Sequence, residues 1–402
     1  MIIVHIITRL IVGGAQENTL ITCREQAEAG HKVYLITGAS TGREGAMFTQ
    51  AQAMGFETIV VKQMFRAIKP FSDIVAFFKL RKLLKEIKPD VVHTHSAKAG
   101  ILGRLAAWGI KGSYKPQSDD YLPKNSSKKL PMVVHTIHGL AFHDYQSRLV
   151  NKFYIAVERF TAKRCDAIIT VADTMRDKAL AAQIGTAKMF TTAYSAIDTK
   201  LFLEPPTETE IKNFRRKNGI SDQSRVNVCV ARLAELKGHE YIIESAKKLS
   251  AQFPDAMWLF VGDGDKVSEI KSKISLASLA HKIRLTGLLK PEAIPLAIHS
   301  SDILVHCSLR EGLARVLPQA MLCGKPVVSF DIDGAKEVVN DSTGRLIAPG
   351  DVEAVVEACR RLLSDKNLCR RLGTNGREQV RRIFAPDVMT DTIQKVYNSF
   401  LQ

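Results

Sequence analysis

The chain has 402 residues, of which 46% are hydrophobic, and this is enough apolar material for two domains with separate cores. No apolar run reaches the roughly 18 residues needed to cross a membrane. The opening MIIVHIITRLIVGGAQ has neither the basic start nor the small-residue cleavage site of a signal peptide. The seven cysteines are scattered and form no CxxC pair, so we expect a cytoplasmic protein with reduced thiols rather than a disulfide-stabilised secreted one.

The formal net charge of +16 at pH 7 calls for an acidic partner. Nucleic acid, an anionic membrane surface and a phosphate-bearing small molecule all meet this requirement. The sequence has no zinc-finger spacing, no aromatic RNA-binding signature and no arginine-rich tail. We therefore expect no nucleic-acid partner, whereas the membrane surface and the phosphorylated ligand stay open.

Short runs rich in Val and Ile alternate with helical patterns along the whole chain. This alternation predicts an α/β fold in which βαβ units build two parallel sheets. The strands expected in the first half are 2–8, 32–37, 57–61, 90–94, 132–137, 166–171 and 188–194. Those expected in the second half are 225–231, 257–262, 282–286, 302–306, 326–330 and 345–348.

The passage between the two halves is expected at residues 194–210, where Pro205 and Pro206 can continue neither a strand nor a helix. A polar insertion at 112–131 is expected to be a surface loop. The expected domains are an N-terminal one over 1–197, a C-terminal one over 205–385, and a last helix over 386–402 that could cross back to the N-terminal domain.

Ligands of open parallel sheets bind at the carboxyl ends of the strands, so the loops after the strands are the candidates for a site in a cleft between two such domains. The first strand is followed by Gly13 and Gly14, which leave room for an anion at backbone N–H groups as the chain turns into a helix near Gln16. The GxGxxG pattern of dinucleotide-binding proteins is absent, and an ordinary tight turn explains the glycine pair equally well.

Four histidines lie near the ends of the fourth and fifth strands, in VVHTHSAKAG and VVHTIHGL. No Asp or Glu accompanies them and the spacings of a zinc site are missing, so we expect no metal. His138, at the very end of a strand, is the better candidate for contact with a ligand, and we expect His93 and His135 to be structural.

In the second half, Arg232 and Lys237 flank the turn from a strand into a helix that begins about Gly238. Two cations beside a helix N-terminus suit a diphosphate, although two solvated cations on a turn would look the same. The next strand ends in VGDGD, where Gly262 and Gly264 permit a sharp turn and could let a nucleotide approach.

The stretch SLREGLARVLPQAML places a loop before a helix that we expect to start near Pro318, because Pro is favoured in the first helical turn. Glu311 could accept hydrogen bonds from sugar hydroxyls, and Gln319 could reach a ribose. The backbone N–H groups that could meet phosphate belong to residues 312–316, among them Gly312, Leu313 and Ala314.

At this point the whole chain resembles the retaining glycosyltransferases of family 4, which have the GT-B fold of two facing Rossmann-like domains. The motifs that carry the resemblance, in the family's order, are GGAQ, VHTHSAKAG, HTIHG, ARLAELKGH, VGDGD, EGLARVLPQAM, DGAKEVV and TGRLIAPGD. The resemblance implies transfer of a sugar from a nucleoside diphosphate sugar, with retention at the anomeric carbon and no permanently bound cofactor.

The resemblance also implies roles for single residues. Arg232 and Lys237 match the family's diphosphate-binding pair, His138 matches the histidine beside the donor sugar, and Glu311 matches the first Glu of the Glu–seven residues–Glu motif. Gly13 and Gly14 match the glycines of the first loop, which faces the cleft. We expect these side chains to act without a metal, the cations stabilising the leaving diphosphate.

The departure from the family pattern is Gln319, which stands where the second Glu of the motif binds the ribose. A carboxylate accepts from both ribose hydroxyls in charge-assisted bonds, whereas an amide accepts one hydrogen bond and donates another. We therefore expect weakened or altered nucleoside binding, with a degenerate site as the alternative.

The acceptor side is less specified. Residues 65–90 combine a basic face with four Phe, which suits either contact with the inner membrane leaflet or an ordinary amphipathic helix on a sheet. We expect a glycan or lipid-linked acceptor, in lipopolysaccharide or polysaccharide synthesis. The alternatives are a sugar-nucleotide epimerase of the same fold and a non-enzymatic, basic membrane- or nucleic-acid-binding protein on a retired transferase scaffold.

Overall fold

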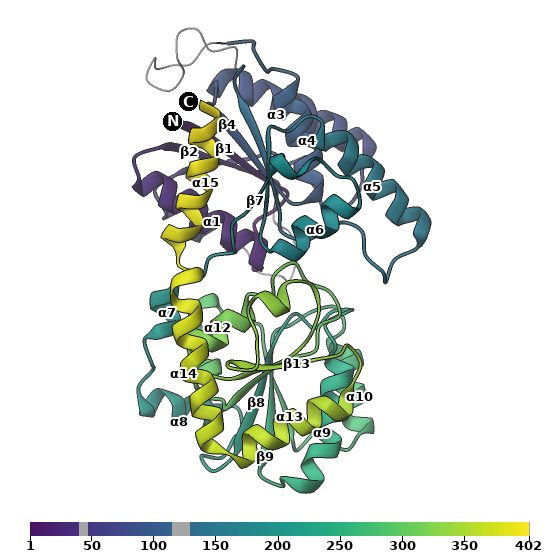
Figure 1. Ribbon diagram of the computed structural model, residues 1–402, viewed down its shortest axis with the longest axis vertical. Helices are drawn as coiled ribbons and strands as arrows, with labels where there is room; N and C mark the ends of the chain where they lie inside the picture. The colour runs from purple at the N-terminus through teal and green to yellow at the C-terminus, as the bar shows by residue number, and fades with distance from the viewer. Residues whose placement is uncertain (40–46, 115–128, 402) are drawn as a thin grey trace. The chain divides into compact units, whose positions relative to one another are not determined.

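The computed structural model describes residues 1–39, 47–114 and 129–401. The chain divides into two compact units, drawn in Figure 1. Unit 1 comprises Met1–Ala196 and the C-terminal segment from Pro386, and unit 2 comprises Ile197–Ala385. Most of the polar insertion expected at 112–131 lies outside the described residues.

The described part of unit 1 contains a seven-stranded, fully parallel sheet in the order β3-β2-β1-β4-β5-β6-β7. Its strands are β1 (Ile2–Ile7), β2 (Lys32–Thr37), β3 (Glu57–Val60), β4 (Val91–His95), β5 (Met132–Ile137), β6 (Ala167–Thr170) and β7 (Phe190–Thr192). The central strands are buried on both faces, which is why they read as nearly continuous apolar runs.

Helices cover both faces of this sheet. They are α1 (Gly14–Glu28), α2 (Phe48–Gln52), α3 (Pro70–Ile87), α4 (Ala97–Trp108), α5 (Arg148–Ala162), α6 (Asp173–Ala181) and α15 (Pro386–Leu401), with a 3-10 turn, η1, at Ala187–Met189. Ile3 and Val91 pack with α1 and α15, whereas the next residues, Val4 and Val92, pack with α3 and α4.

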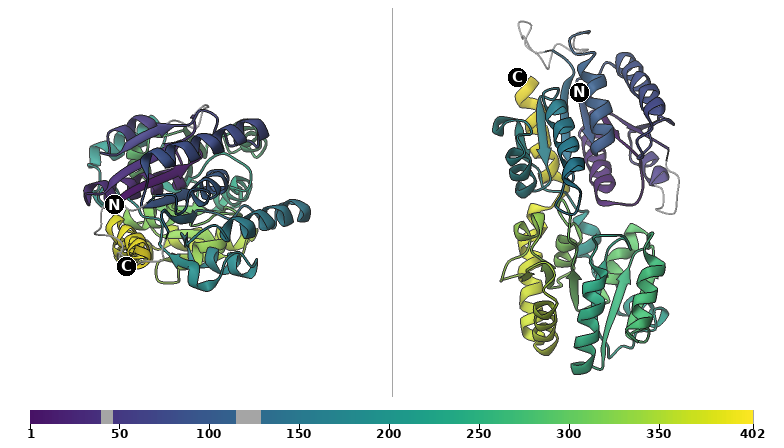
Figure 2. Two further views of the ribbon diagram at one scale, coloured as in Figure 1. Left: turned by 90° about the horizontal axis from the view of Figure 1, so that it is seen from above. Right: turned by 90° about the vertical axis from the view of Figure 1, so that its right-hand side faces the viewer.

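The last helix belongs to unit 1 although the preceding helix belongs to unit 2. Met389, Ile393 and Tyr397 of α15 share a buried cluster with Ile3 of β1. Figures 1 and 2 accordingly show α15 beside the N-terminal strand.

The described part of unit 2 contains a six-stranded parallel sheet in the order β10-β9-β8-β11-β12-β13. Its strands are β8 (Arg225–Val230), β9 (Ala256–Val261), β10 (Ile283–Gly287), β11 (Ile303–His306), β12 (Val327–Phe330) and β13 (Gly344–Ile347). Its helices are α7 (Thr199–Leu203), α8 (Glu208–Lys217), α9 (His239–Gln252), α10 (Val267–Leu276), α11 (Ile294–His299), α12 (Val316–Leu322), α13 (Val352–Ser364) and α14 (Lys366–Ile383), with 3-10 turns η2 at Pro291–Ala293 and η3 at Asp333–Glu337. Trp258 and Phe260 of β9 anchor its core.

The predicted fold class is confirmed, because every strand expected from the sequence exists with ends shifted by at most two residues. In unit 1 the strand order reverses at β1, between β2 and β4. In unit 2 it reverses at β8, between β9 and β11. Such reversals open a crevice at the carboxyl ends of the strands, which places the candidate site in each unit. Among the described residues, no helix is long and apolar enough to cross a membrane.

Candidate functional site

In unit 2 the loop after β8 carries Arg232, which is exposed, and Lys237, which is largely buried. Gly238 ends the loop with φ +68°, and a Cβ there would lie 1.8 Å from the carbonyl oxygen of Cys307. Only glycine fits, so the loop after β8 packs directly against the end of β11. This close approach brings Lys237 to the residues that follow β11.

Lys237 and Glu311 form the ionic centre of this unit. Lys237 Nζ lies 2.5 Å from Glu311 Oε1, and His306 Nε2 lies 3.5 Å from the same oxygen. The two charged side chains are only 19% and 20% exposed. Burial by itself would raise the pKa of Glu311, but the Lys237 charge and the His306 hydrogen bond outweigh it and hold that pKa well below its usual range.

The Glu311 loop is also held by the 3-10 turn η3, which follows the next strand, β12. The Glu311 amide donates to Asp333 Oδ2 at 2.7 Å, and Gly334 N–H donates to the Gly312 carbonyl at 3.3 Å. The sequence analysis named neither His306 nor Asp333. The signal was their position at the carboxyl ends of β11 and β12, the strands beside the Glu311 loop.

The glycines after β9 serve packing in the structure. A Cβ on Gly262 would lie 2.1 Å from the Ala231 carbonyl oxygen, and one on Gly264 would lie 2.3 Å from that of Leu233. Both glycines let the β8 and β9 loops touch. A contact between Gly262 and a nucleotide stays a prediction.

The helix expected to start near Pro318 begins earlier, at Val316, with Arg315 as its N-cap. The start lies two residues before Pro318 because the first four N–H groups of a helix have no partner within it, so Pro is tolerated at the third position as well as the first. Gln319 is half-buried just behind the first turn. Gly312, Leu313 and Ala314 are buried, so their backbone rather than their side chains would meet a ligand.

In unit 1 the glycine pair opens α1. The helix begins at Gly14 with Gly13 as its N-cap, two residues before the expected Gln16. The loop of residues 8–13 separates the N-terminus of α1 from the end of β1.

A cavity of about 510 Å³ lies beside this loop, between the N-terminal parts of α3 and α4 and the face of α5. Apolar side chains line much of it, including Ile68, Ile101 and Phe153, together with the cations Arg9, Arg66 and Lys98. Lys98 Nζ pairs with Asp73 at 2.5 Å. The cavity could not be predicted from the sequence, since its walls come from four segments that only the fold assembles.

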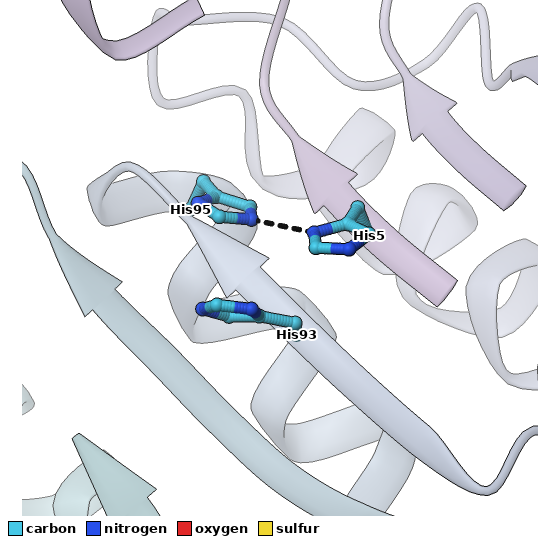
Figure 3. A group of neighbouring side chains, drawn as sticks. All are labelled: His5, His93 and His95. Carbon is cyan, nitrogen blue, oxygen red and sulfur yellow. Dashed lines mark hydrogen bonds between the residues drawn. The ribbon is translucent and has the colours of Figure 1, made fainter. Parts of the chain in front are cut away.

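His138 follows β5 and is half-buried, and its Nε2 lies 3.0 Å from Nδ1 of His95. His5, His93 and His95 form a cluster behind it, on neighbouring strands β1 and β4, as Figure 3 shows. His5 belongs to the cluster because the parallel register of β1 and β4 pairs it with His93. His5 carries no signal in the sequence, because it lies within the first strand rather than at its end.

The structure gives His93 and His135 internal partners. His93 bonds Tyr397 Oη and Thr136 Oγ1, both at 2.6 Å. His135 bonds Thr94 Oγ1 at 2.9 Å, and it packs so tightly on α4 that a Cβ on Gly100 would lie 2.5 Å from its ring. Gly100 is therefore needed for α4 to pack against the His135 ring.

Within the described chain, His5, His93 and His95 are the set whose ligand atoms come close enough for a shared metal, all lying within 4.8 Å of one another. Their nitrogens already bond to each other or to side chains, with His5 Nδ1 2.9 Å from His95 Nε2. An ion would have to displace this bond, and no carboxylate or thiolate belongs to the set. A hydrogen-bonded cluster describes these residues better than a metal site.

Two family profiles match the chain. Residues 12–201 match the profile of Glycosyltransferase Family 4, and residues 210–379 match that of Glycosyl transferases group 1. The chain belongs to the family 4 glycosyltransferases, and it is a glycosyltransferase.

Among its relatives is the UDP-Gal:alpha-D-GlcNAc-diphosphoundecaprenol alpha-1,3-galactosyltransferase of Escherichia coli, 29% identical over 332 residues, 80% of each chain. Another is the N-acetyl-alpha-D-glucosaminyl L-malate synthase of Bacillus anthracis, 22% identical over 94% of this chain and 92% of that one. Among solved structures, Anabaena HepE in complex with UDP-glucose matches with a TM-score of 0.81 at 19% identity, over 99% of this chain and all of that one. This last likeness shows the shared GT-B fold.

Proposed function

We propose that this glycosyltransferase transfers a hexose or N-acetylhexosamine from a nucleoside diphosphate sugar, of the UDP-sugar or GDP-mannose type, to a hydroxyl of a lipid-linked or other glycan acceptor. The observation that carries the proposal is the Lys237–Glu311–His306 group at the strand-order reversal of unit 2. The UDP-Gal in the name of the E. coli relative and the UDP-glucose bound to HepE support it.

The donor contacts follow from charge. Arg232 and Lys237 hold the diphosphate and stabilise the charge that develops when it leaves. Glu311, kept anionic by Lys237, accepts hydrogen bonds from sugar hydroxyls. The Gln319 side chain accepts a hydrogen bond from one ribose hydroxyl through its carbonyl oxygen and donates one to the other hydroxyl through its amide N–H.

For the chemistry we propose front-face substitution with retention. The acceptor oxygen bonds to the anomeric carbon on the side from which the diphosphate departs, the bond from that carbon to the diphosphate oxygen breaks, and the acceptor proton passes to the departing diphosphate. The protein's own residues supply positioning and charge, without a metal.

For the acceptor we propose the cavity of unit 1. Its apolar wall and its cations suit an amphiphile that carries phosphate, such as the diphosphoundecaprenol-linked GlcNAc in the name of the E. coli relative. Beside it, α3 and α5 expose apolar side chains, Phe71 at 89% and Leu149 at 79%. With a net charge of +16, this face would meet the anionic inner leaflet as a peripheral contact.

Thermal-shift titration with UDP, GDP, ADP and CMP tests the donor assignment. A ligand at 100 times its Kd stabilises the fold by about 2.7 kcal/mol. We expect one diphosphate to raise the Tm, Arg232→Ala to abolish the rise, and Arg216→Ala, an exposed arginine of α8, to leave it intact. If no nucleotide binds, the donor proposal fails.

Product analysis tests the rest. NMR of the glycosidic linkage distinguishes retention from inversion, and release of free nucleoside diphosphate separates transfer from epimerisation. For the membrane contact, Phe71→Ser with Leu149→Ser should reduce co-sedimentation with phosphatidylglycerol vesicles. Equal co-sedimentation by variant and wild type would contradict the proposed docking face.

A further inference from the structure

A continuous chain of hydrogen bonds runs through the buried core of unit 1 to His138. Gln26 Oε1 of α1 lies 2.7 Å from His5 Nε2, His5 Nδ1 lies 2.9 Å from His95 Nε2, and His95 Nδ1 lies 3.0 Å from His138 Nε2. Figure 3 shows its central link. Gln26, His5 and His95 are essentially inaccessible to solvent.

The fold does not require polar groups at these positions. The neighbours of His5 on the same face of β1 are Ile3 and Ile7, which pack as ordinary core residues. Burying an imidazole costs free energy unless its nitrogens are paired. A row of paired imidazoles that ends at a strand-end histidine therefore points to a task at that end.

The two buried imidazoles of the chain, His5 and His95, are neutral. Burial lowers the pKa of His5 to about 4 and that of His95 well below the ordinary value, and the neighbouring imidazoles lower the pKa of His95 further. The titratable groups beside the chain are the imidazoles of His93 and His135, and Tyr397 of α15 and Thr136 of β5 bond to His93.

A neutral imidazole has one donor and one acceptor nitrogen, so one end of the chain sets the direction of every bond. The Gln26 carbonyl oxygen accepts from His5 Nε2–H. His5 Nδ1 then accepts from His95 Nε2–H, and His95 Nδ1 accepts from His138 Nε2–H. In a neutral His138 ring this order leaves Nδ1 without a proton.

We propose that Gln26, His5 and His95 are positioning residues that fix His138 as the Nε2–H tautomer, so that its Nδ1 can only accept a hydrogen bond. His138 would then select a donor on its ligand, which in a sugar is a hydroxyl. This consequence for the sugar rests on the proposed function, but the tautomer itself does not.

Selective ¹⁵N labelling of histidine tests the tautomer, because two-bond ¹H–¹⁵N spectra distinguish a protonated Nδ1 from a protonated Nε2. The signal that His138→Gln removes identifies the ring. We expect Nε2–H for His138 in the unliganded protein. A proton on Nδ1 would mean that the Gln26 amide is reversed, and an even mixture would mean that the chain sets no direction; either overturns the proposal.

Variants test the chain. Gln26→Met and His95→Leu interrupt it and should give His138 a mixture of tautomers, with kcat/KM reduced by up to about tenfold, the size of one net hydrogen bond. His95→Gln keeps a donor and an acceptor on one planar group and should preserve the Nε2–H form. Thr136→Val is the matched control, because it removes a buried partner of His93 outside the chain.

The proposal fails if Gln26→Met leaves the His138 tautomer unchanged, or if Thr136→Val shifts it equally. Tm values identify variants that are merely unfolded. Because the spectrum needs no substrate, it also separates this proposal from the donor assignment, which fails independently if no nucleotide binds.

Discussion

The two units have the same doubly wound parallel sheet, but they place different chemistry at the carboxyl ends of their strands. Unit 2 brings formal charges together, Lys237 against Glu311 at 2.5 Å. Unit 1 brings neutral imidazoles together, with burial lowering the pKa of each member of the His5, His93 and His95 cluster. In the function we propose, unit 2 stabilises the charge that develops on the diphosphate, whereas the neutral imidazoles of unit 1 orient a ligand.

The largest expected effect comes from removing the cation of the charged pair in unit 2. Lys237→Ala removes the cation that we propose stabilises the leaving diphosphate, and we expect kcat/KM to fall about 10²- to 10³-fold. It also leaves Glu311 buried without its counter-ion, so the pKa of Glu311 should rise, measurable by NMR titration of the carboxyl.

Lys248→Ala is the control for this loss. Lys248 also pairs with a glutamate, Glu353, but at an exposed site, where such pairs contribute little. A comparable loss of activity in both variants would contradict the special role of Lys237.

The second prediction concerns the neutral side and pH. The pKa of His5 is about 4 in the folded protein and about 6.5 when unfolded, so the unfolded chain binds more protons between these values. His5 therefore contributes stability above pH 6.5, about 3 kcal/mol, that is lost as the pH falls towards 4, with about 2 kcal/mol gone by pH 5.

Chemical unfolding at pH 7.5 and pH 5.0 measures this loss, and His5→Gln should reduce the difference between the two. An equal pH dependence in His5→Gln would show that His5 does not stay neutral in the folded protein. His281→Gln is the control, since it removes a histidine outside this core.

The strands, and the loops that carry the candidate residues, could be predicted from the sequence. Buried parallel strands consist of short runs of β-branched residues that end at glycines and polar residues. The sequence was insufficient for contacts that need strand order. His5 and His95 are 90 residues apart and meet only because β4 pairs with β1. Lys237 and Glu311 are 74 residues apart and meet because Gly238 closes on Cys307.

A third, smaller effect concerns the last helix, α15, whose Tyr397 is hydrogen-bonded to His93 of the histidine cluster. Tyr397→Phe removes the hydroxyl that bonds His93 Nδ1 at 2.6 Å and leaves a buried nitrogen without that partner. We expect a loss of about 1–3 kcal/mol in the free energy of unfolding. Tyr145→Phe, at a half-exposed ring, should change it by much less. Equal losses would mean that the α15 contact with β4 is not stabilised by this bond.

The smallest expected effect tests whether Gln319 of unit 2 contacts the ribose. Gln319→Glu restores the carboxylate that the family pattern has at this position, and a charge-assisted bond is about twice as strong as a neutral one. If Gln319 contacts the ribose, the Kd of the preferred nucleotide should fall about fivefold, corresponding to about 1 kcal/mol. Gln223→Glu adds the same charge at an exposed site of unit 2 and should leave the Kd unchanged. An unchanged Kd in Gln319→Glu would mean that residue 319 does not contact the ribose. Tighter binding would instead mean that the glutamine loosens the nucleoside while Lys237 and Glu311 keep the charged part of the site intact.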